Sequence, residues 1–175
     1  ANIKTGVTVT LSPNILISGG TMTDDVGIVS NNYTLDGNGT YDGSGNATVN
    51  GNFSWVNGTI TGSNLLTING TGSVTTTNTK TLSGSKEFRI AGSTTFTNAP
   101  ISMAGTAKLS VESGGTLTWN NNSNNITVSG TATNIVEIKS GGTFIKTGSN
   151  FLEIRAQMNM NNGSIQIQNG ILRSS

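Results

Sequence analysis

Pairs of apolar residues separated by one position recur along the second half of the chain, and each pair is followed by residues that favour turns, mostly Gly, Asn or Ser. The pairs are Phe88/Ile90, Ile101/Met103, Leu109/Val111, Leu117/Trp119, Ile126/Val128, Val136/Ile138, Leu152/Ile154, Met158/Met160 and Ile165/Ile167. Residues i and i+2 of a β-strand lie on the same face, so each pair marks the buried face of a short strand. We find no convincing apolar stripe with the period of a helix. The sequence therefore predicts many short strands joined by turns and very little helix.

Small polar residues make up more than half of the chain, with 28 Thr, 24 Gly, 24 Asn and 20 Ser among its 175 residues. Only 10% of the residues are charged, whereas average domains have roughly 25%. Disordered segments usually combine a high net charge with few β-branched residues. This chain has a net charge of +1 and abundant Val, Ile and Thr. The composition therefore indicates an ordered β protein that is solubilised by hydroxyls and amides.

Short strands of this kind occur in sandwiches, barrels and solenoids, and three features favour the solenoid. The segments SGGTLTW, SGGTFIK and NGSIQIQ resemble one repeated module. The strands are about three to five residues long, which is short for a sandwich. Glu87, Glu112 and Glu137 recur 25 positions apart, which suits a coil of about three strands with the carboxylates outside. We expect an all-β fold, a single-stranded parallel β-helix (β-solenoid) of about seven to nine coils.

The inward-facing positions of these strands form the predicted core. They are Phe88, Ile90, Leu109, Val111, Leu117, Trp119, Ile126, Val128, Val136, Ile138, Leu152 and Ile154. Burial of each such side chain contributes roughly 1.5–3 kcal/mol. A charge at Ile126 or Val136 is therefore expected to unfold neighbouring coils.

The two ends of the chain differ in pattern. Residues 1–60 have less regular apolar spacing and are expected to form an N-terminal cap and the first coils, and residues 61–175 the regular repeats of the same continuous domain. The segment GSIQIQNGILRSS continues the repeat without an evident cap. Either the chain is cut there or another molecule covers that end, because open solenoid ends expose unpaired backbone groups. Ile165, Ile167, Ile171 and Leu172 are the residues of this predicted assembly end.

The segment YTLDGNGTYDG, residues 33–43, resembles the opening coils of right-handed parallel β-helix proteins of the pectate-lyase-like kind. The Gly- and Asn-rich repeats that follow are similar to the passenger regions of bacterial autotransporters, to filamentous-haemagglutinin-type adhesins and to viral and phage spike proteins. The resemblance implies a right-handed solenoid at the cell surface or outside the cell. It does not imply a particular activity, because one fold serves many functions.

The chain has no Cys and no His. Disulfides and thiolate metal sites are therefore excluded, and the commonest general base is missing. Nine basic residues balance eight acidic ones, and there is no membrane-length apolar run. We therefore expect neither nucleic-acid binding nor membrane insertion. The chain begins at Ala1 without a signal peptide, which suggests a mature secreted form or a piece of a longer protein.

One cluster of carboxylates could support chemistry, and it consists of Asp24, Asp25, Asp36 and Asp42. Polysaccharide lyases of this fold use calcium-binding carboxylates, and hydrolases use paired ones. Asp36, Asn38 and Asp42 also offer oxygen ligands for calcium. Asp in Asp-Gly sequences, however, usually bonds its own backbone in a turn. We favour turns here, and expect no cofactor, although calcium stays an alternative.

Thr-x-Thr pairs could form a ladder of hydroxyls and methyls on one face of the solenoid. The candidate binding-face residues are Thr59, Thr61, Thr75, Thr77, Thr95, Thr97, Thr116 and Thr118. Their intervals along the chain are irregular, and Thr is a common residue on exposed strands. Trp55 is a further candidate for stacking on a sugar, although a core position is favoured.

The function that the sequence favours is a non-catalytic structural or adhesive module outside the cell or on its surface. Its expected partners are further copies of itself, stacked end to end, or a glycan or protein of a host or surface. Two alternatives stay open: a solenoid that binds carbohydrate or ice, and an enzyme that cleaves polysaccharides as lyases or hydrolases of this fold do.

Overall fold

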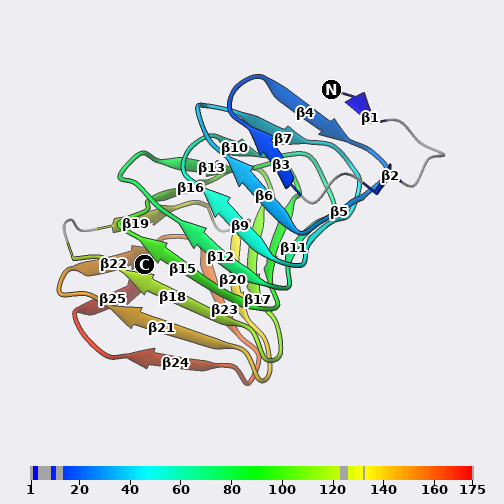
Figure 1. The fold of residues 1–175 in the computed structure, drawn as a ribbon. Helices are drawn as coiled ribbons and strands as arrows, with labels where there is room; N and C mark the ends of the chain where they lie inside the picture. The colour runs from blue at the N-terminus through cyan, green and yellow to red at the C-terminus, as the bar shows by residue number, and fades with distance from the viewer. Residues whose placement is uncertain (1, 4–8, 11–13, 123–125, 132, 175) are drawn as a thin grey trace.

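The computed structural model describes residues 2–3, 9–10, 14–122, 126–131 and 133–174. For residues 2–3, 9–10 and 126 only the backbone is described, so the predicted burial of Ile126 lies outside the described side chains. The chain forms three parallel sheets that wind into a β-solenoid of about 7 turns, with coils of about 21 residues. Each strand pairs with the equivalent strand of the next coil (Figure 1). The predicted all-β parallel solenoid is confirmed.

Each coil contributes one strand to each sheet. Sheet A consists of β1 (Asn2–Ile3), β4 (Thr21–Asp24), β7 (Thr40–Asp42), β10 (Thr59–Ile60), β13 (Lys80–Leu82), β16 (Ile101–Met103), β19 (Ile126–Ser129), β22 (Phe151–Ile154) and β25 (Ile171–Ser174). Sheet B consists of β2 (Val9–Thr10), β5 (Ile28–Ser30), β8 (Ala47–Val49), β11 (Leu65–Ile68), β14 (Glu87–Ile90), β17 (Lys108–Val111), β20 (Ile135–Ile138) and β23 (Gln157–Met160). Sheet C consists of β3 (Asn14–Ile17), β6 (Asn32–Leu35), β9 (Asn52–Trp55), β12 (Thr71–Val74), β15 (Ser93–Thr97), β18 (Thr116–Asn120), β21 (Thr143–Thr147) and β24 (Ser164–Ile167).

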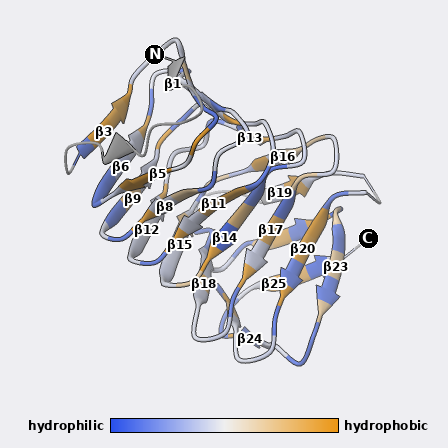
Figure 2. Cartoon of the chain, turned by 90° about the vertical axis from the view of Figure 1, so that its right-hand side faces the viewer, coloured by the Kyte–Doolittle hydropathy of each residue, from blue (hydrophilic) through white to orange (hydrophobic). Residues whose placement is uncertain are grey.

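The solenoid is right-handed, as the resemblance implied. In Figure 1 the strands of sheet C cross the front of the molecule, and the strands of sheet A return behind them as the chain descends from the N-terminal end. Sheet B closes the third side and faces the viewer in Figure 2.

The core follows from the alternation of side chains along each strand. Inward positions carry apolar residues and outward positions carry polar ones, so most strands bury every second residue. The predicted core residues whose side chains are described are each exposed by 2% or less. They are Phe88, Ile90, Leu109, Val111, Leu117, Trp119, Val128, Val136, Ile138, Leu152 and Ile154. Because each sits above its equivalent in the next coil, one core runs along the axis.

Aromatic side chains form a continuous ladder inside this core. Successive ring centroids lie 5.9 Å apart from Tyr33 to Phe53, 5.3 Å from Phe53 to Phe88, 6.5 Å from Phe88 to Phe96 and 4.5 Å from Phe96 to Trp119. Such offset and edge contacts add to the stabilisation by burial. Trp55, the candidate for stacking on a sugar, is also in the core, with 1% exposure.

Coil length changes along the axis although the strand register is kept. In sheet C, Phe53 pairs with Gly72, Gly72 with Thr94, Thr94 with Leu117 and Leu117 with Phe144. These steps correspond to 19, 22, 23 and 27 residues. The additional residues lie in the turns, which are free to vary because the backbone pairing is made by the strands.

Asparagine ladders join the turns of neighbouring coils. Asn57 Nδ2 donates to Asn38 Oδ1 at 2.8 Å, and Asn69 Nδ2 donates to Asn50 Oδ1 at 3.0 Å. Asn38 has a φ of 63°, a backbone conformation that Asn tolerates better than most residues. The Asn content of the sequence thus serves the corners of the solenoid.

At the C-terminal end, the last coil is less well covered than the others. Met160, Ile167 and Ile171 are 51%, 54% and 52% exposed. Ile165 and Leu172, which point inward, are only partly buried against the core. These positions include the four residues of the predicted assembly end, and their strands β24 and β25 stand at the edges of sheets C and A.

The first prediction concerns the core. Val136→Asp places a carboxylate on a fully buried position of β20, and should lower the free energy of unfolding by about 4 kcal/mol or more, as expected for an unpaired buried charge. Urea unfolding followed by circular dichroism measures this change. Gln157→Asp, on the exposed side of the next coil, is the control and should change stability little. Equal stability of the two variants would contradict the core assignment.

Candidate binding face

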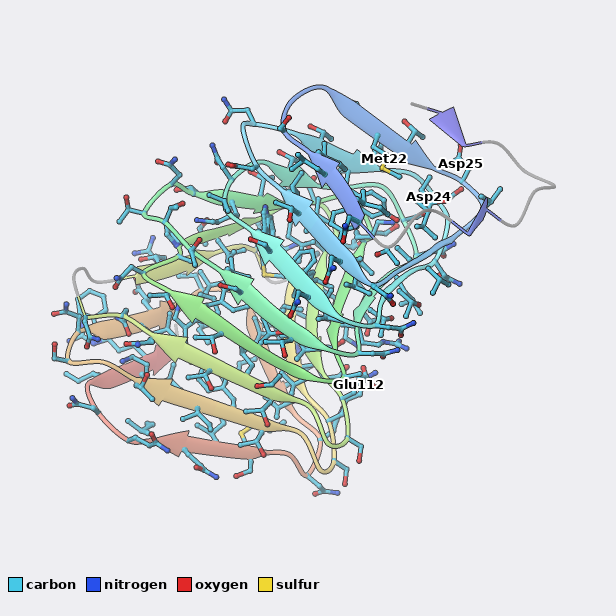
Figure 3. The ribbon with its side chains drawn as sticks, viewed as in Figure 1. Met22, Asp24, Asp25 and Glu112 are labelled. Atoms are coloured by element: carbon cyan, nitrogen blue, oxygen red, sulfur yellow. The ribbon has the colours of Figure 1, made fainter. Side chains whose placement is uncertain are left out.

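The three sheets present outward surfaces of different chemistry, which we call faces A, B and C after their sheets. The strands that carry them are held by backbone hydrogen bonds to both neighbouring coils. Differences between the faces therefore reflect only which side chains occupy the outward positions. Figure 2 shows face B, and Figures 1 and 3 show face C.

Face B carries a network of ion pairs. Arg89 Nε lies 3.2 Å from both Glu87 Oε1 and Glu112 Oε1, and Lys139 Nζ lies 2.7 Å from Glu112 Oε1. Lys108 pairs with Glu137. The three glutamates that recur in the sequence thus meet on one face, and Figure 3 labels Glu112. Burial raises the pKa of Glu87, but hydrogen bonds from Ser110 and Arg89 outweigh it and bring the pKa below its ordinary value. Since acids and bases are matched, the network is best explained as structural support across three coils.

Face A carries a column of hydroxyl groups. Thr21, Thr40, Thr59, Thr81 and Ser102 are aligned by the pairing of consecutive strands. A second column on face A lies two residues further along each strand. In it, Ser83 Oγ donates a hydrogen bond to Thr61 Oγ1, 2.9 Å long. This column also contains Asp42, opposite Thr23 in the register. A charge therefore interrupts this face.

The outward positions of face C carry no charged side chain on its described strands, and Lys146 of β21 points inward. Its outward positions are Asn14, Leu16, Asn32, Thr34, Asn52, Ser54, Thr71, Ser73, Ser93, Thr95, Thr97, Thr116, Thr118, Asn120, Thr143, Ile145, Thr147, Ser164 and Gln166. Hydroxyl residues are concentrated in the middle of the face, on β12, β15, β18 and β21. The aromatic residues of these strands all point into the core.

The hydroxyls of face C form a two-dimensional array. One column contains Thr71, Ser93, Thr116 and Thr143. A second contains Ser73, Thr95 and Thr118, and a third contains Thr97, Asn120 and Thr147. Neighbouring strands lie roughly 4.7–4.9 Å apart, and residues i and i+2 of one strand are about 6.6–6.8 Å apart. Because Thr is stiff at χ1 and both neighbouring strands hold the backbone, these groups are well fixed in space.

Of the eight Thr predicted for a binding face, five belong to face C and its border. Thr95, Thr97, Thr116 and Thr118 lie on β15 and β18, and Thr75 directly follows β12. Thr59 and Thr61 belong to face A. Thr77 lies in the exposed turn between β12 and β13. The Thr-x-Thr pattern therefore identifies part of the array on face C, but it also includes residues of face A.

Other members of the array do not belong to Thr-x-Thr pairs, and this pattern therefore does not mark them. They are Thr71, Ser73, Ser93 and Thr143. Ser offers a hydroxyl as Thr does but interrupts the Thr-x-Thr pattern, and the unequal coil lengths hide the register in the sequence. Alignment of the segments TGSVT, STTFT, TLTWN and TFIKT on their inward residues would have shown the columns.

The clustered aspartates accept hydrogen bonds from backbone amides, either within their own turn or, for Asp25, from the next coil. Asp36 Oδ1 accepts a hydrogen bond from Gly37 N, and Asp42 Oδ1 accepts one from Gly43 N, both 2.7 Å long. Asp25 Oδ1 accepts from the backbone and hydroxyl of Ser44. Asn38, the other candidate calcium ligand, accepts from Asn57. Among the described residues there is no group of three or more acidic side chains arranged to hold a metal ion.

Asp24 belongs to a buried cluster with Tyr41 and Lys86. Its Oδ2 accepts from the Tyr41 hydroxyl at 3.0 Å, and its Oδ1 accepts from the backbone of Val26 and Gly27 (Figure 3). Lys86 Nζ lies 5.0 Å from the centroid of the Tyr41 ring and donates to the Gly43 carbonyl. Asp24, Tyr41 and Lys86 are each 0% exposed. This placement suits a structural role, because a polymeric substrate cannot reach buried groups.

Two further buried lysines hold turns together. Lys80 Nζ donates to the Thr76 carbonyl at 2.8 Å, to Thr76 Oγ1 at 2.9 Å and to the Asn78 carbonyl at 2.8 Å. Thr76 has a φ of 74°, which is strained for a β-branched residue. Lys146 Nζ similarly donates to the carbonyls of Thr147, Gly148 and Asn169. Each buried ammonium group thus donates to at least two carbonyls of neighbouring turn residues, which compensates for its removal from water.

Comparison with known proteins yields no relative, because no protein-family model, curated protein or solved structure matches this chain. Within the described ranges, no helix is long and apolar enough to cross a membrane. The chain is therefore characterised by its fold, a parallel β-solenoid.

The second prediction concerns pH. Burial lowers the pKa of Lys80 to about 8 from its ordinary value of 10.5, so the unfolded chain binds more protons between these two pH values and stability should rise with pH in that range. Burial, and to a smaller extent the negative charge of Asp24, raise the pKa of Tyr41 above its ordinary value of 10.0. Above pH 10 the unfolded chain therefore binds fewer protons than the folded chain, and stability should fall again. Thermal unfolding across this range should show a maximum.

Two variants separate these contributions. Lys80→Met should reduce the rise in melting temperature above pH 8, and Tyr41→Phe should reduce the fall above pH 10. Melting temperatures that do not change with pH in the parent chain, or that change equally in both variants, would argue against these assignments.

Proposed function

We propose that the chain is a non-catalytic structural or adhesive module of an extracellular or cell-surface protein. The observation that carries the proposal is the single core that runs along the axis from Ile15 to Ile154. Consecutive described coils are joined by backbone hydrogen bonds along the axis in each of the three sheets. Such a rod resists bending and presents its side faces at fixed spacing. The resemblance of its sequence to autotransporter passengers, adhesins and viral spikes supports the extracellular setting.

We further propose that copies of the rod stack end to end. Met160 and Ile167 occupy inward columns of the last coil and are more than half exposed. Ile171, also named for the assembly end, instead points outward on face A beside Phe151. Edge strands and exposed apolar layers favour association with a matching solenoid coil. A second copy offers such a coil at its N-terminal end, where Ile15 and Ile17 begin the core column of sheet C.

Charge complementarity supports this choice of partner. Residues 1–60 contain four aspartates and one lysine, and residues 138–175 contain four basic residues and one glutamate. The two ends of the rod therefore have opposite net charge. This attraction favours head-to-tail over head-to-head contact, and a contact between unlike ends propagates into a filament.

The strand count specifies how the copies would join. Sheet A has nine strands, and sheets B and C have eight. In the proposed junction, β2 and β3 of a second copy pair with β23 and β24 of the first copy. The strand β25 of the first copy then pairs with β4 of the second copy, in the place that β1 of the second copy otherwise occupies. β1 pairs with β4 through only two residue pairs, so it is the weaker strand at this position. The junction then continues all three sheets without a gap.

The third prediction tests this junction by cross-linking. The chain contains no Cys, and Leu16 of β3 and Gln166 of β24 belong to the same outward column at opposite ends of sheet C. A disulfide between Leu16→Cys and Gln166→Cys can therefore form only between copies in which β3 of one pairs with β24 of the other. Paired strands place such residues within the range for a disulfide. Oxidation of the double variant should give a ladder of covalent multimers on a non-reducing gel.

Controls separate a specific junction from random collision. Each single Cys variant should yield dimers at most, and Ser73→Cys with Gln166→Cys, which uses the same column of sheet C but an internal coil, should yield no ladder. Sedimentation of the parent chain should show a mass that rises with concentration and falls with added salt. Ile167→Lys should abolish the rise, whereas Ile145→Lys on face C should not. A mass of one chain at every concentration would refute stacking.

A further inference from the structure

Face C has a regular chemistry that the proposed structural role does not require. A supporting rod needs outward residues that are soluble, and mixed charges would serve equally well, as on face B. Instead, the middle of face C carries hydroxyls on four consecutive coils and no charge at the outward positions of its described strands. Such uniformity suggests a ligand that is itself uncharged and repetitive.

Several classes of ligand are poorly matched by this surface. Polyanions need basic residues, and none occupies an outward position on the described strands of sheet C, where the single lysine, Lys146 of β21, is buried. Sugars are commonly bound by stacking on exposed aromatic rings, but Phe53, Trp55, Phe96 and Trp119 are all buried. Protein interfaces usually have large apolar or arginine anchors at their centre, and the centre of face C has Ser and Thr.

The array matches the surface of an ice crystal. Ice presents water molecules that both donate and accept hydrogen bonds at fixed repeats, without net charge. The spacing of the array between coils, roughly 4.7–4.9 Å, is close to the shorter oxygen repeat on a prism face of hexagonal ice. The spacing along the strands, about 6.6–6.8 Å, is somewhat shorter than the longer repeat. Each Thr supplies a hydroxyl that can join the lattice and a methyl that can fill the space between water molecules.

Rigidity makes many weak contacts effective together. A surface whose groups are already fixed loses little conformational entropy on binding. Thr95 and Thr118 are aligned in β15 and β18, which pair over five residues, and Thr97 and Asn120 extend the same pairing. Ile145 replaces a hydroxyl in β21, so the most regular part of the array lies on β12, β15 and β18.

We propose that face C binds ice, with Thr71, Ser73, Ser93, Thr95, Thr116 and Thr118 as its central contacts. This activity is independent of end-to-end stacking, because one copy already presents the array. Loss of the stacked state by Ile167→Lys should therefore leave ice binding by the single rod intact.

The fourth prediction tests this face by substitution. The purified chain should lower the freezing point below the melting point of an ice crystal in a nanolitre osmometer and should be enriched in a growing ice hemisphere. Thr95→Tyr and Thr118→Tyr place a large ring in the middle of the array and should abolish most of both effects. Thr67→Tyr on face B and Thr59→Tyr on face A are matched controls and should retain them. Unchanged circular dichroism establishes that each variant is folded.

Three results would overturn the proposal. The first is a folded parent chain that neither shifts the freezing point nor enters the ice. The second is an equal loss in Thr67→Tyr and Thr95→Tyr, which would show that face C is not special. The third is retention on crystalline cellulose or chitin that Thr95→Tyr abolishes, without any effect on ice, which would assign the face to a polysaccharide.

Discussion

The parallel pairing of each coil with the next is the constraint on which the rest of this structure depends. Because pairing fixes which residues lie above one another, each inward position becomes a column through the core and each outward position a column on a face. Val74, Phe96 and Trp119, for example, follow one another on adjacent coils. A change in one residue is therefore felt by two neighbours in the same column. The core, the ion-pair network and the hydroxyl array are three consequences of the same register.

Much of this fold could be predicted from the sequence because the inward pairs are apolar and the turns are rich in Gly and Asn. The pairs Leu117/Trp119 and Val136/Ile138 mark β18 and β20. The N-terminal coils were harder to predict, since Tyr33, Tyr41 and the buried Asp24 occupy inward positions there. Asp24 is compatible with burial because the Tyr41 hydroxyl and two backbone amides satisfy its carboxylate.

The candidate face could be predicted only in part. Spacing along the chain does not determine which Thr residues meet, because turns of different length separate strands that remain in register. Thr59 and Thr95 look equivalent in the sequence but lie on different sheets. The buried lysines had no recognisable pattern either, since their role depends on carbonyls that only the folded turns bring together. Both features are set by the pairing between coils rather than by local sequence.

The measurement that tests the register most directly is disulfide formation within one chain. Thr95 and Thr118 are opposite one another on adjacent coils, so the double variant Thr95→Cys/Thr118→Cys should oxidise readily and keep its circular dichroism. The variant Thr95→Cys/Asn120→Cys, displaced by two residues along the strand, should oxidise much more slowly. Faster oxidation of the displaced pair would show that the strands are out of the proposed register, and the columns of the core and of face C would have to be redrawn.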